Sequence, residues 1–252
     1  MCFLSVSAVA FAANCSIESR THAIIGRHLI RGAVVLETGA RYGTTSCFIA
    51  ALLGNSGHLV SVEPDSSVWS ALEENRQSHN CQFWIVRGVI AESSNSSSNS
   101  SNSNSNGGGG VLPYRHTNQG YASRTFPSSS SSSSGGSQYD PSESRRAWTL
   151  SEMSTITGLR FDTLVIDCEG CIQFLFPLSL SAAALAQRLE HVRTMIIEAD
   201  MPVFGGIETD CSALCVDYGV WIQNFRAVGF ELVEKTLEPE YPWIFFYVLV
   251  RR

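Results

Sequence analysis

The stretch AVVLETGARYG, residues 33–43, decides the fold. It opens with a short apolar run that ends in an acid, Glu37, and continues into a turn that holds Gly39 and Gly43. Residues 44–53 then have helical character, so the stretch predicts a strand, a loop and a helix. Gly39 allows the chain to turn and a ligand to approach the backbone closely, while Gly43 opens the helix. We therefore expect the first unit of an α/β sheet here.

The same alternation continues along the chain. Strands are predicted at residues 58–63, 83–87, 161–167 and 192–198, and helices from Ser66 or Ser67 to about residue 78, over residues 174–190 and over about 215–228. Continuous apolar runs are typical of parallel strands covered on both faces. Residues 229–233 and 243–250 are separated by a turn short enough for an antiparallel pair. The pattern predicts an α/β, Rossmann-like fold with a mostly parallel seven-stranded sheet, an antiparallel C-terminal strand and helices on both faces.

Length and composition set the domain organisation. The 252 residues, 44% of them hydrophobic, can bury one substantial core. Residues 93–144 are rich in Ser, Asn and Gly, and such a composition cannot bury enough apolar surface to offset the entropy of ordering. We predict an N-terminal segment over residues 1–30 and a domain over 31–252 that a disordered insertion at 93–144 interrupts. Within that insertion, residues 111–126 are the part that could contact the domain.

Charge and hydropathy narrow the classes of partner. The net charge of −6 offers no electrostatic reason to expect a nucleic acid, which clustered Lys and Arg normally bind. No apolar run approaches the roughly 20 residues that a membrane-spanning helix needs. The apolar run from Cys2 to Ala13 is either a signal-like start or a helix, and it lacks the basic residues of a signal peptide. A cytoplasmic location is favoured, with secretion left open, and nothing here predicts the oligomeric state.

The eight cysteines are too few for a disulfide scaffold in a chain of this length. Cys168-x-x-Cys171 and Cys211-x-x-x-Cys215 could form two halves of a zinc site. The first pair, however, straddles a strand end and a tight turn, which is an awkward platform for two converging thiolates. Ordinary buried thiols are the favoured interpretation, and no metal site is predicted.

The glycine turn stands where a doubly wound sheet places its ligand, at the carboxyl end of a strand. It lacks the third glycine of a dinucleotide fingerprint and the Lys-Ser/Thr of a phosphate loop, which argues against NAD and ATP. About twenty residues later, Glu63 ends the second strand, where a carboxylate can accept hydrogen bonds from both ribose hydroxyls. The alternative is that Glu63 is a solvated acid at the start of a helix.

Further acids end later strands. Asp167 and Glu169 stand at the tip of the strand predicted over 161–167, and Glu198 ends the next one at the same edge of the sheet. Acids in such a position are candidates for binding a ligand amine, holding a metal or transferring a proton. Alternatively, Asp167 or Glu169 caps the following helix.

Together these residues resemble the FkbM-type methyltransferases, class I enzymes that use S-adenosylmethionine. The resemblance runs from about Val34 to the end of the sequence, without the insertion. It is carried by residues 37–46, by Val62-Glu63-Pro64-Asp65, by Asn75, and by Asp162 through Ile166-Asp167-Cys168-Glu169-Gly170. The sequence departs from the family where it has Glu37-Thr38 and Arg41-Tyr42, and where the segment after the third strand enters the insertion.

The resemblance implies a fold, a cofactor and a site. The fold would be the methyltransferase version of the Rossmann-like sheet. Glu37 and Gly39 would contact the methionine part of the cofactor and Glu63 its ribose, and Asp167 and Glu169 would be catalytic. Further cofactor-binding residues would be Ala40, Gly43, Pro64 and Asp65. The implied reaction is O-methylation of a small-molecule, sugar or lipid hydroxyl. A catalytically silent binding domain and an NAD-dependent oxidoreductase are the alternatives.

Overall fold

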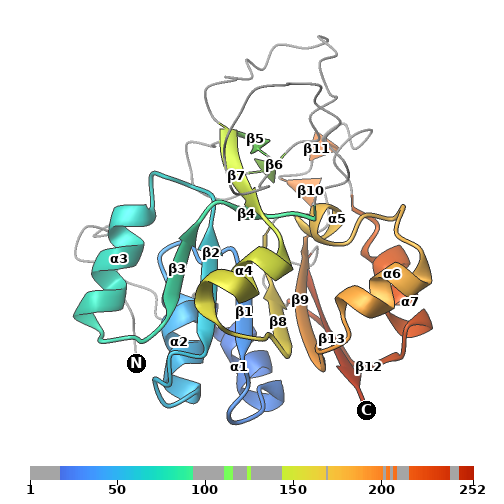
Figure 1. The fold of residues 1–252 in the computed structure, drawn as a ribbon, viewed down its shortest axis with the longest axis horizontal. Helices are drawn as coiled ribbons and strands as arrows, with labels where there is room; N and C mark the ends of the chain where they lie inside the picture. Colours follow the sequence, from blue (N-terminus) through green and yellow to red (C-terminus); the bar gives the residue numbers. More distant parts are fainter. Residues whose placement is uncertain are drawn as a thin grey trace.

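A seven-stranded sheet forms the centre of the computed structural model, which describes residues 18–92, 111–115, 124–125, 144–168, 170–200, 203–204, 207–208, 216–238 and 244–252 (Figure 1). The strand order is β12-β13-β9-β8-β1-β2-β3. The strands are β1 (Val35–Thr38), β2 (Leu59–Glu63), β3 (Trp84–Arg87), β8 (Thr163–Ile166), β9 (Thr194–Asp200), β12 (Phe230–Leu237) and β13 (Ile244–Arg251).

All neighbouring strands of this sheet are parallel except those that pair with β13. Strand β13 lies between β9 and β12 and is antiparallel to both. The predicted α/β fold with one antiparallel strand is therefore confirmed. Strands β1, β2 and β8 are buried along their whole length, which agrees with their continuous apolar runs.

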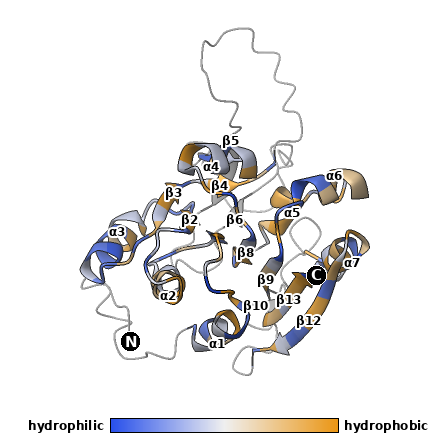
Figure 2. Ribbon diagram, turned by 60° about the horizontal axis from the view of Figure 1, so that its bottom comes forward, coloured by the Kyte–Doolittle hydropathy of each residue, from blue (hydrophilic) through white to orange (hydrophobic). Residues whose placement is uncertain are grey.

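Helices cover both faces of the sheet and enclose two hydrophobic cores. One core includes Ile25, Ile49 and Leu72, from α1 (Ser19–His28), α2 (Thr44–Leu52) and α3 (Trp69–Ser78). The other includes Met153 and Phe225. Its helices are α4 (Leu150–Thr157), α5 (Ile172–Leu175), α6 (Ala182–Arg188) and α7 (Tyr218–Ala227). Figure 2 shows hydrophobic and hydrophilic residues along α6 and α7, as expected for helices that bury one face. In the described part of the chain, no helix is long and apolar enough to span a bilayer.

Two smaller sheets accompany the main one. A four-stranded sheet has the order β4-β7-β5-β6, with β4 (Val89–Ile90), β5 (Val111–Arg115), β6 (Arg124–Thr125) and β7 (Ser144–Trp148). Figure 1 places it beyond the carboxyl ends of the central strands. Strands β5 and β6 lie within the range 93–144, and β5 pairs with β7. The other sheet pairs β10 (Val203–Phe204) with β11 (Ile207–Glu208).

Two predicted helices differ from those observed. The helix expected over residues 174–190 is two helices, α5 and α6, and Pro177 lies between them, where it cannot donate a backbone hydrogen bond. Neither Ser66 nor Ser67 caps α3, whose N-cap is Val68. Residues 66–68 form a turn instead, because the Asp65 carboxylate accepts hydrogen bonds from the backbone and the hydroxyl of Ser67.

Candidate functional site

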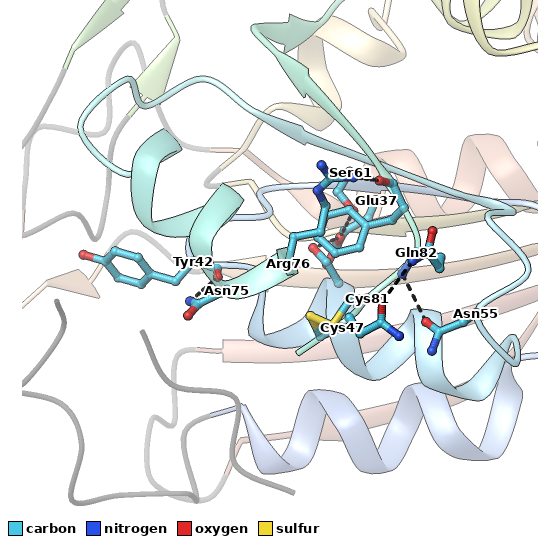
Figure 3. Close-up of a disulfide and its surroundings, with 12 residues drawn as sticks. Glu37, Tyr42, Cys47, Asn55, Ser61, Asn75, Arg76, Cys81 and Gln82 are labelled. Atoms are coloured by element: carbon cyan, nitrogen blue, oxygen red, sulfur yellow. Dashed lines mark hydrogen bonds between the residues drawn. A yellow bond between two sulfur atoms is a disulfide. The ribbon is translucent and has the colours of Figure 1, made fainter. Parts of the chain in front are cut away.

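The glycine turn lies over the carboxyl ends of β2 and β8. The amides of Gly39 and Ala40 both donate to the Val62 carbonyl, and Gly43 donates to the carbonyl of Ala40. Gly39 has φ 85°, and a Cβ atom there would lie 1.6 Å from the carbonyl oxygen of Asp167. No side chain fits in that space, so the turn requires glycine at position 39. Asn75 holds the far end of the turn by donating to the Tyr42 carbonyl at 2.7 Å (Figure 3).

Glu37 lies in the core under this turn. It is 1% exposed, and one carboxylate oxygen accepts hydrogen bonds from Ser46 at 2.5 Å and Ser61 at 2.6 Å. Burial raises the pKa of Glu37 to about 7, although both hydroxyls favour the ionised form. Figure 3 shows Glu37 and Ser61 near the disulfide between Cys47 and Cys81. Glu37 therefore connects α2 to β2 beneath the glycine turn and supports the turn from below.

Glu63 connects the glycine turn to the loop after β2. One carboxylate oxygen accepts from the Arg41 amide and the other from the Asp65 amide, both at 2.6 Å. Glu63 is 5% exposed, and burial raises its pKa to about 7 against the opposing effect of the two backbone hydrogen bonds. It is thus a buried carboxylate and not a solvated helix-start acid. Each oxygen can still accept a second hydrogen bond, because a carboxylate has about four acceptor positions.

The structure brings most of the predicted site residues together at one edge of the sheet. Strands β1 and β2 end side by side, since Thr38 pairs with Val62. The residues that follow these ends include Gly39, Ala40, Gly43, Pro64 and Asp65, with Glu37 and Glu63 on the strands themselves. Their contact with a cofactor remains a prediction.

Asp167 ends β8 at the same edge. It is half-buried, and its amide donates to the Thr38 carbonyl at 3.2 Å. The register pairs Ile166 with Ile197, so Asp167 stands beside Glu198 on β9. Asp162 lies at the opposite end of β8, where its carboxylate accepts from the Val34 amide and the Thr163 hydroxyl, and it stabilises the strand start. Glu169 lies outside the described residues.

Helix α1 adds polar groups that the sequence analysis did not select. The Thr45 hydroxyl donates to Glu18, and His22 Nε2 lies 3.1 Å from the same hydroxyl oxygen. The Thr21 hydroxyl donates to Glu198 at 3.2 Å. Burial lowers the pKa of His22 to about 4, so this imidazole is neutral at pH 7. These contacts join positions far apart in the sequence, and no motif spacing marks them.

The four cysteines within the described residues are paired, in contrast to the buried thiols that we expected. Cys47 on α2 forms a disulfide with Cys81, and Cys168 forms one with Cys171. The spacing alone did not show that α2 and the residues after α3 bring Cys47 and Cys81 to a Cα separation of 5.3 Å. The disulfide also removes Cys168 and Cys171 as thiolate ligands for zinc. Cys211 and Cys215 lie outside the described residues, and the described part contains no cluster of three metal-ligating side chains.

Comparisons with known proteins support the fold. No family model and no curated protein matches the sequence. Among solved structures, an S-adenosylmethionine-dependent methyltransferase from Aquifex aeolicus aligns with a TM-score of 0.50 and 9% identity, over 98% of each chain. Fibrillarin from Aeropyrum pernix with bound S-adenosyl-L-methionine has a TM-score of 0.47 and 12% identity, over 92% of this chain and 74% of its own.

A third similar structure is magnesium protoporphyrin IX methyltransferase from Synechocystis PCC 6803 with bound SAH. Its TM-score is 0.47 at 10% identity, and the alignment covers 94% of this chain and 82% of that one. Two of these three structures hold S-adenosyl-L-methionine or SAH, and the Aquifex aeolicus protein, with the TM-score of 0.50, is an S-adenosylmethionine-dependent methyltransferase. At these identities the likeness establishes the α/β architecture of the chain.

Proposed function

We propose that this protein is an S-adenosylmethionine-dependent methyltransferase of the FkbM type. One observation carries the proposal: the buried Glu63 carboxylate joins the glycine turn after β1 to the loop after β2, through the amides of Arg41 and Asp65. This arrangement supports the proposal, because Glu63, the proposed ribose-binding acid, lies beside the glycine turn at the carboxyl edge of a parallel sheet. The likeness to the Aquifex aeolicus methyltransferase supports the choice among Rossmann-like proteins.

The chemistry of the residues fits the cofactor. Adenosine presents two ribose hydroxyls, and the remaining acceptor positions of Glu63 suit them. The methionine part is cationic at its amine and sulfonium, and the acids Asp167 and Glu198 stand at the edge of the sheet beside the turn, while the buried Glu37 supports the turn from below. Gly39, Ala40 and Gly43 would contact the methionine part, while Pro64 and Asp65 would lie at the ribose.

The proposed reaction is O-methylation of a hydroxyl on a small molecule, sugar or lipid. The cofactor, when bound, would supply a methyl group that is attached to its positively charged sulfur. The oxygen–carbon bond forms as the carbon–sulfur bond breaks, and S-adenosylhomocysteine is the leaving group. Asp167 accepts the proton of the attacking hydroxyl. Glu169, the other proposed catalytic acid, lies outside the described residues. The strand ends hold the two reactants in line, which is the main contribution a protein makes to such a displacement.

The first test of the cofactor is calorimetric titration of the full chain with S-adenosylmethionine, S-adenosylhomocysteine and NAD. We expect both adenosylated compounds to bind, NAD not to bind, and Glu63→Ala to weaken binding at least about tenfold, because a charge-assisted pair of hydrogen bonds is lost. Glu231→Ala, at an exposed acid of β12, is the control. Binding of NAD alone would favour an oxidoreductase, and no binding of either class would contradict the proposal.

The role of Asp167 is tested by Asp167→Asn. Asparagine keeps the size of the side chain but cannot accept the proton, so we expect wild-type affinity for S-adenosylmethionine and at least about a hundredfold loss of methyl transfer. Transfer is measured with radiolabelled cofactor on an acceptor found in a hydroxyl-compound screen. Turnover at the wild-type rate would exclude Asp167 as the base. Cofactor binding without transfer to any acceptor, in the wild type, would favour the silent binding domain.

A further inference from the structure

Strand β7 contacts the loop that follows Glu63. Arg145 Nε donates to the Pro64 carbonyl at 2.6 Å, and Nη2 donates to the Ser66 hydroxyl at 3.1 Å. The guanidinium also lies 6.0 Å from the ring centre of Trp69, whose indole N–H donates to the Glu63 carbonyl at 3.0 Å. One side chain of β7 therefore holds the loop 64–66 in place.

The same strand also packs against the segment that follows β3. Strand β7 pairs in parallel with β4, joining Val89 to Ala147 and Ile90 to Trp148. The two segments cross so closely that a Cβ atom on Gly88, which has φ 143°, would lie 2.4 Å from the Arg146 carbonyl oxygen. The indole of Trp148 donates to the Arg87 carbonyl at 3.2 Å. The backbone of residues 87–90 is thus fixed by β7.

These two contacts converge beside the proposed ribose acid. Glu63 pairs with Arg87 across β2 and β3, and the Gly88 amide donates to the Glu63 carbonyl at 3.0 Å. The strand order is β8-β1-β2-β3. On the proposed function, with the methionine part over β8 and β1 and the ribose on Glu63 of β2, the adenine base would extend toward the end of β3, where loop 64–66 and residues 88–90 lie.

We propose that β7 is a structural part of the cofactor site and that Arg145 is a positioning residue for the adenosine half of the ligand. This inference rests on the proposed function. Arg145 acts through the loop that it holds. When the loop samples other conformations, the observed affinity equals the intrinsic affinity multiplied by the fraction of molecules that are competent to bind. Strand β7 thus contacts both segments that flank Glu63, the loop 64–66 and residues 87–90.

The test compares two ligands on the full chain. S-adenosylhomocysteine carries the amino-acid part, whereas 5′-methylthioadenosine retains the adenosine and lacks it. We expect Arg145→Ala to raise the Kd of both compounds by the same factor, about tenfold, because two hydrogen bonds from a charged group are lost on the adenosine side. Arg145→Lys should recover part of the loss, since an ammonium can donate to the Pro64 carbonyl but does not reproduce the two-pronged guanidinium contact.

The matched control is Arg146→Ala. Arg146 is exposed on the same strand and lies over the Trp148 ring, away from loop 64–66, so its Kd values should stay within about twofold of wild type. Wild-type affinity in Arg145→Ala would overturn the inference. If circular dichroism shows that Arg145→Ala is unfolded, Arg145→Lys and Ser66→Ala decide the question, and unchanged Kd values in both would overturn it. Failure of the wild-type protein to bind either compound would instead reject the proposed function, and this inference with it.

Discussion

Glu37 and Glu63 are buried acids on neighbouring strands, and their partners give them different tasks. Glu37 accepts hydrogen bonds from the hydroxyls of Ser46 on α2 and Ser61 on β2, and so connects elements of the core. Glu63 binds backbone amides of two loops and so sets the shape of the ligand edge. Burial raises the pKa of both carboxyls to about 7, which means that both change charge in the range where the protein would work.

The raised pKa of Glu37 predicts how stability depends on pH. Because the folded chain binds this proton more tightly than the unfolded chain does, the free energy of unfolding falls as pH rises from about 4.5 to about 7. Glu37→Gln removes that titration and keeps the size of the side chain. We therefore expect the Tm of Glu37→Gln to decline less than the wild-type Tm between pH 5 and pH 7.5, as measured by thermal denaturation at both values.

The outcome that would contradict this prediction is an identical decline of Tm in the wild type and in Glu37→Gln. Glu231→Gln serves as the control, because Glu231 is an exposed acid that pairs with Arg252 at the surface. That variant should follow the wild-type pH dependence, since exposed ion pairs contribute little to stability.

At the scale of elements, the sequence pattern predicted the strands better than the helices. Strand β1, the glycine turn and Glu63 were identifiable because apolar runs and glycine spacing are local signals. Helix α4 was missed since it follows the low-complexity tract, although Thr149 and Glu152 form a capping box whose spacing is visible in the sequence. The contribution of α1 to the site was missed because Glu18 and His22 meet Thr45 only through tertiary contacts.

The crossing of β4 and β7 gives a prediction about one element pair. Gly88→Ala would place a Cβ atom against the Arg146 carbonyl and would strain a backbone with φ 143°. We expect this variant to lose about 2 kcal/mol of unfolding free energy or more, measured by urea denaturation. Gly57→Ala is a useful control, because Gly57 also has positive φ, 76°, but nothing lies within 4 Å of its added Cβ.

Backbone strain without a clash should make Gly57→Ala the milder of these two variants, at roughly 1 kcal/mol. Equal losses in both would mean that the close approach of β7 to Gly88 contributes nothing to stability. Such a result would also weaken the claim that β7 fixes residues 87–90.

At the scale of the whole molecule, the central seven-stranded sheet is continuous although about 75 residues separate β3 from β8 in the sequence. In the four-stranded sheet, β7 pairs with β4, the short strand that follows β3 in the sequence. The disulfide between Cys47 and Cys81 links α2 to the residues after α3 within the half of the domain that precedes the interruption. The insertion at residues 93–144 stays a prediction from composition, and the pairing of β7 with β4 and β5 depends on tertiary contacts that composition does not encode.

The long separation of β3 from β8 in the sequence has a consequence during synthesis of the chain. Strand β1 pairs with β2 on one side and with β8 on the other, yet about 75 residues separate the end of β3 from the start of β8. At ribosomal rates of about 5–20 residues per second, the edge of β1 that pairs with β8 stays unpaired for roughly 4–15 s after β3 has been synthesised. An unpaired edge is a template for aggregation, so during this time the nascent chain exposes such an edge at β1, a strand that lies inside the finished sheet.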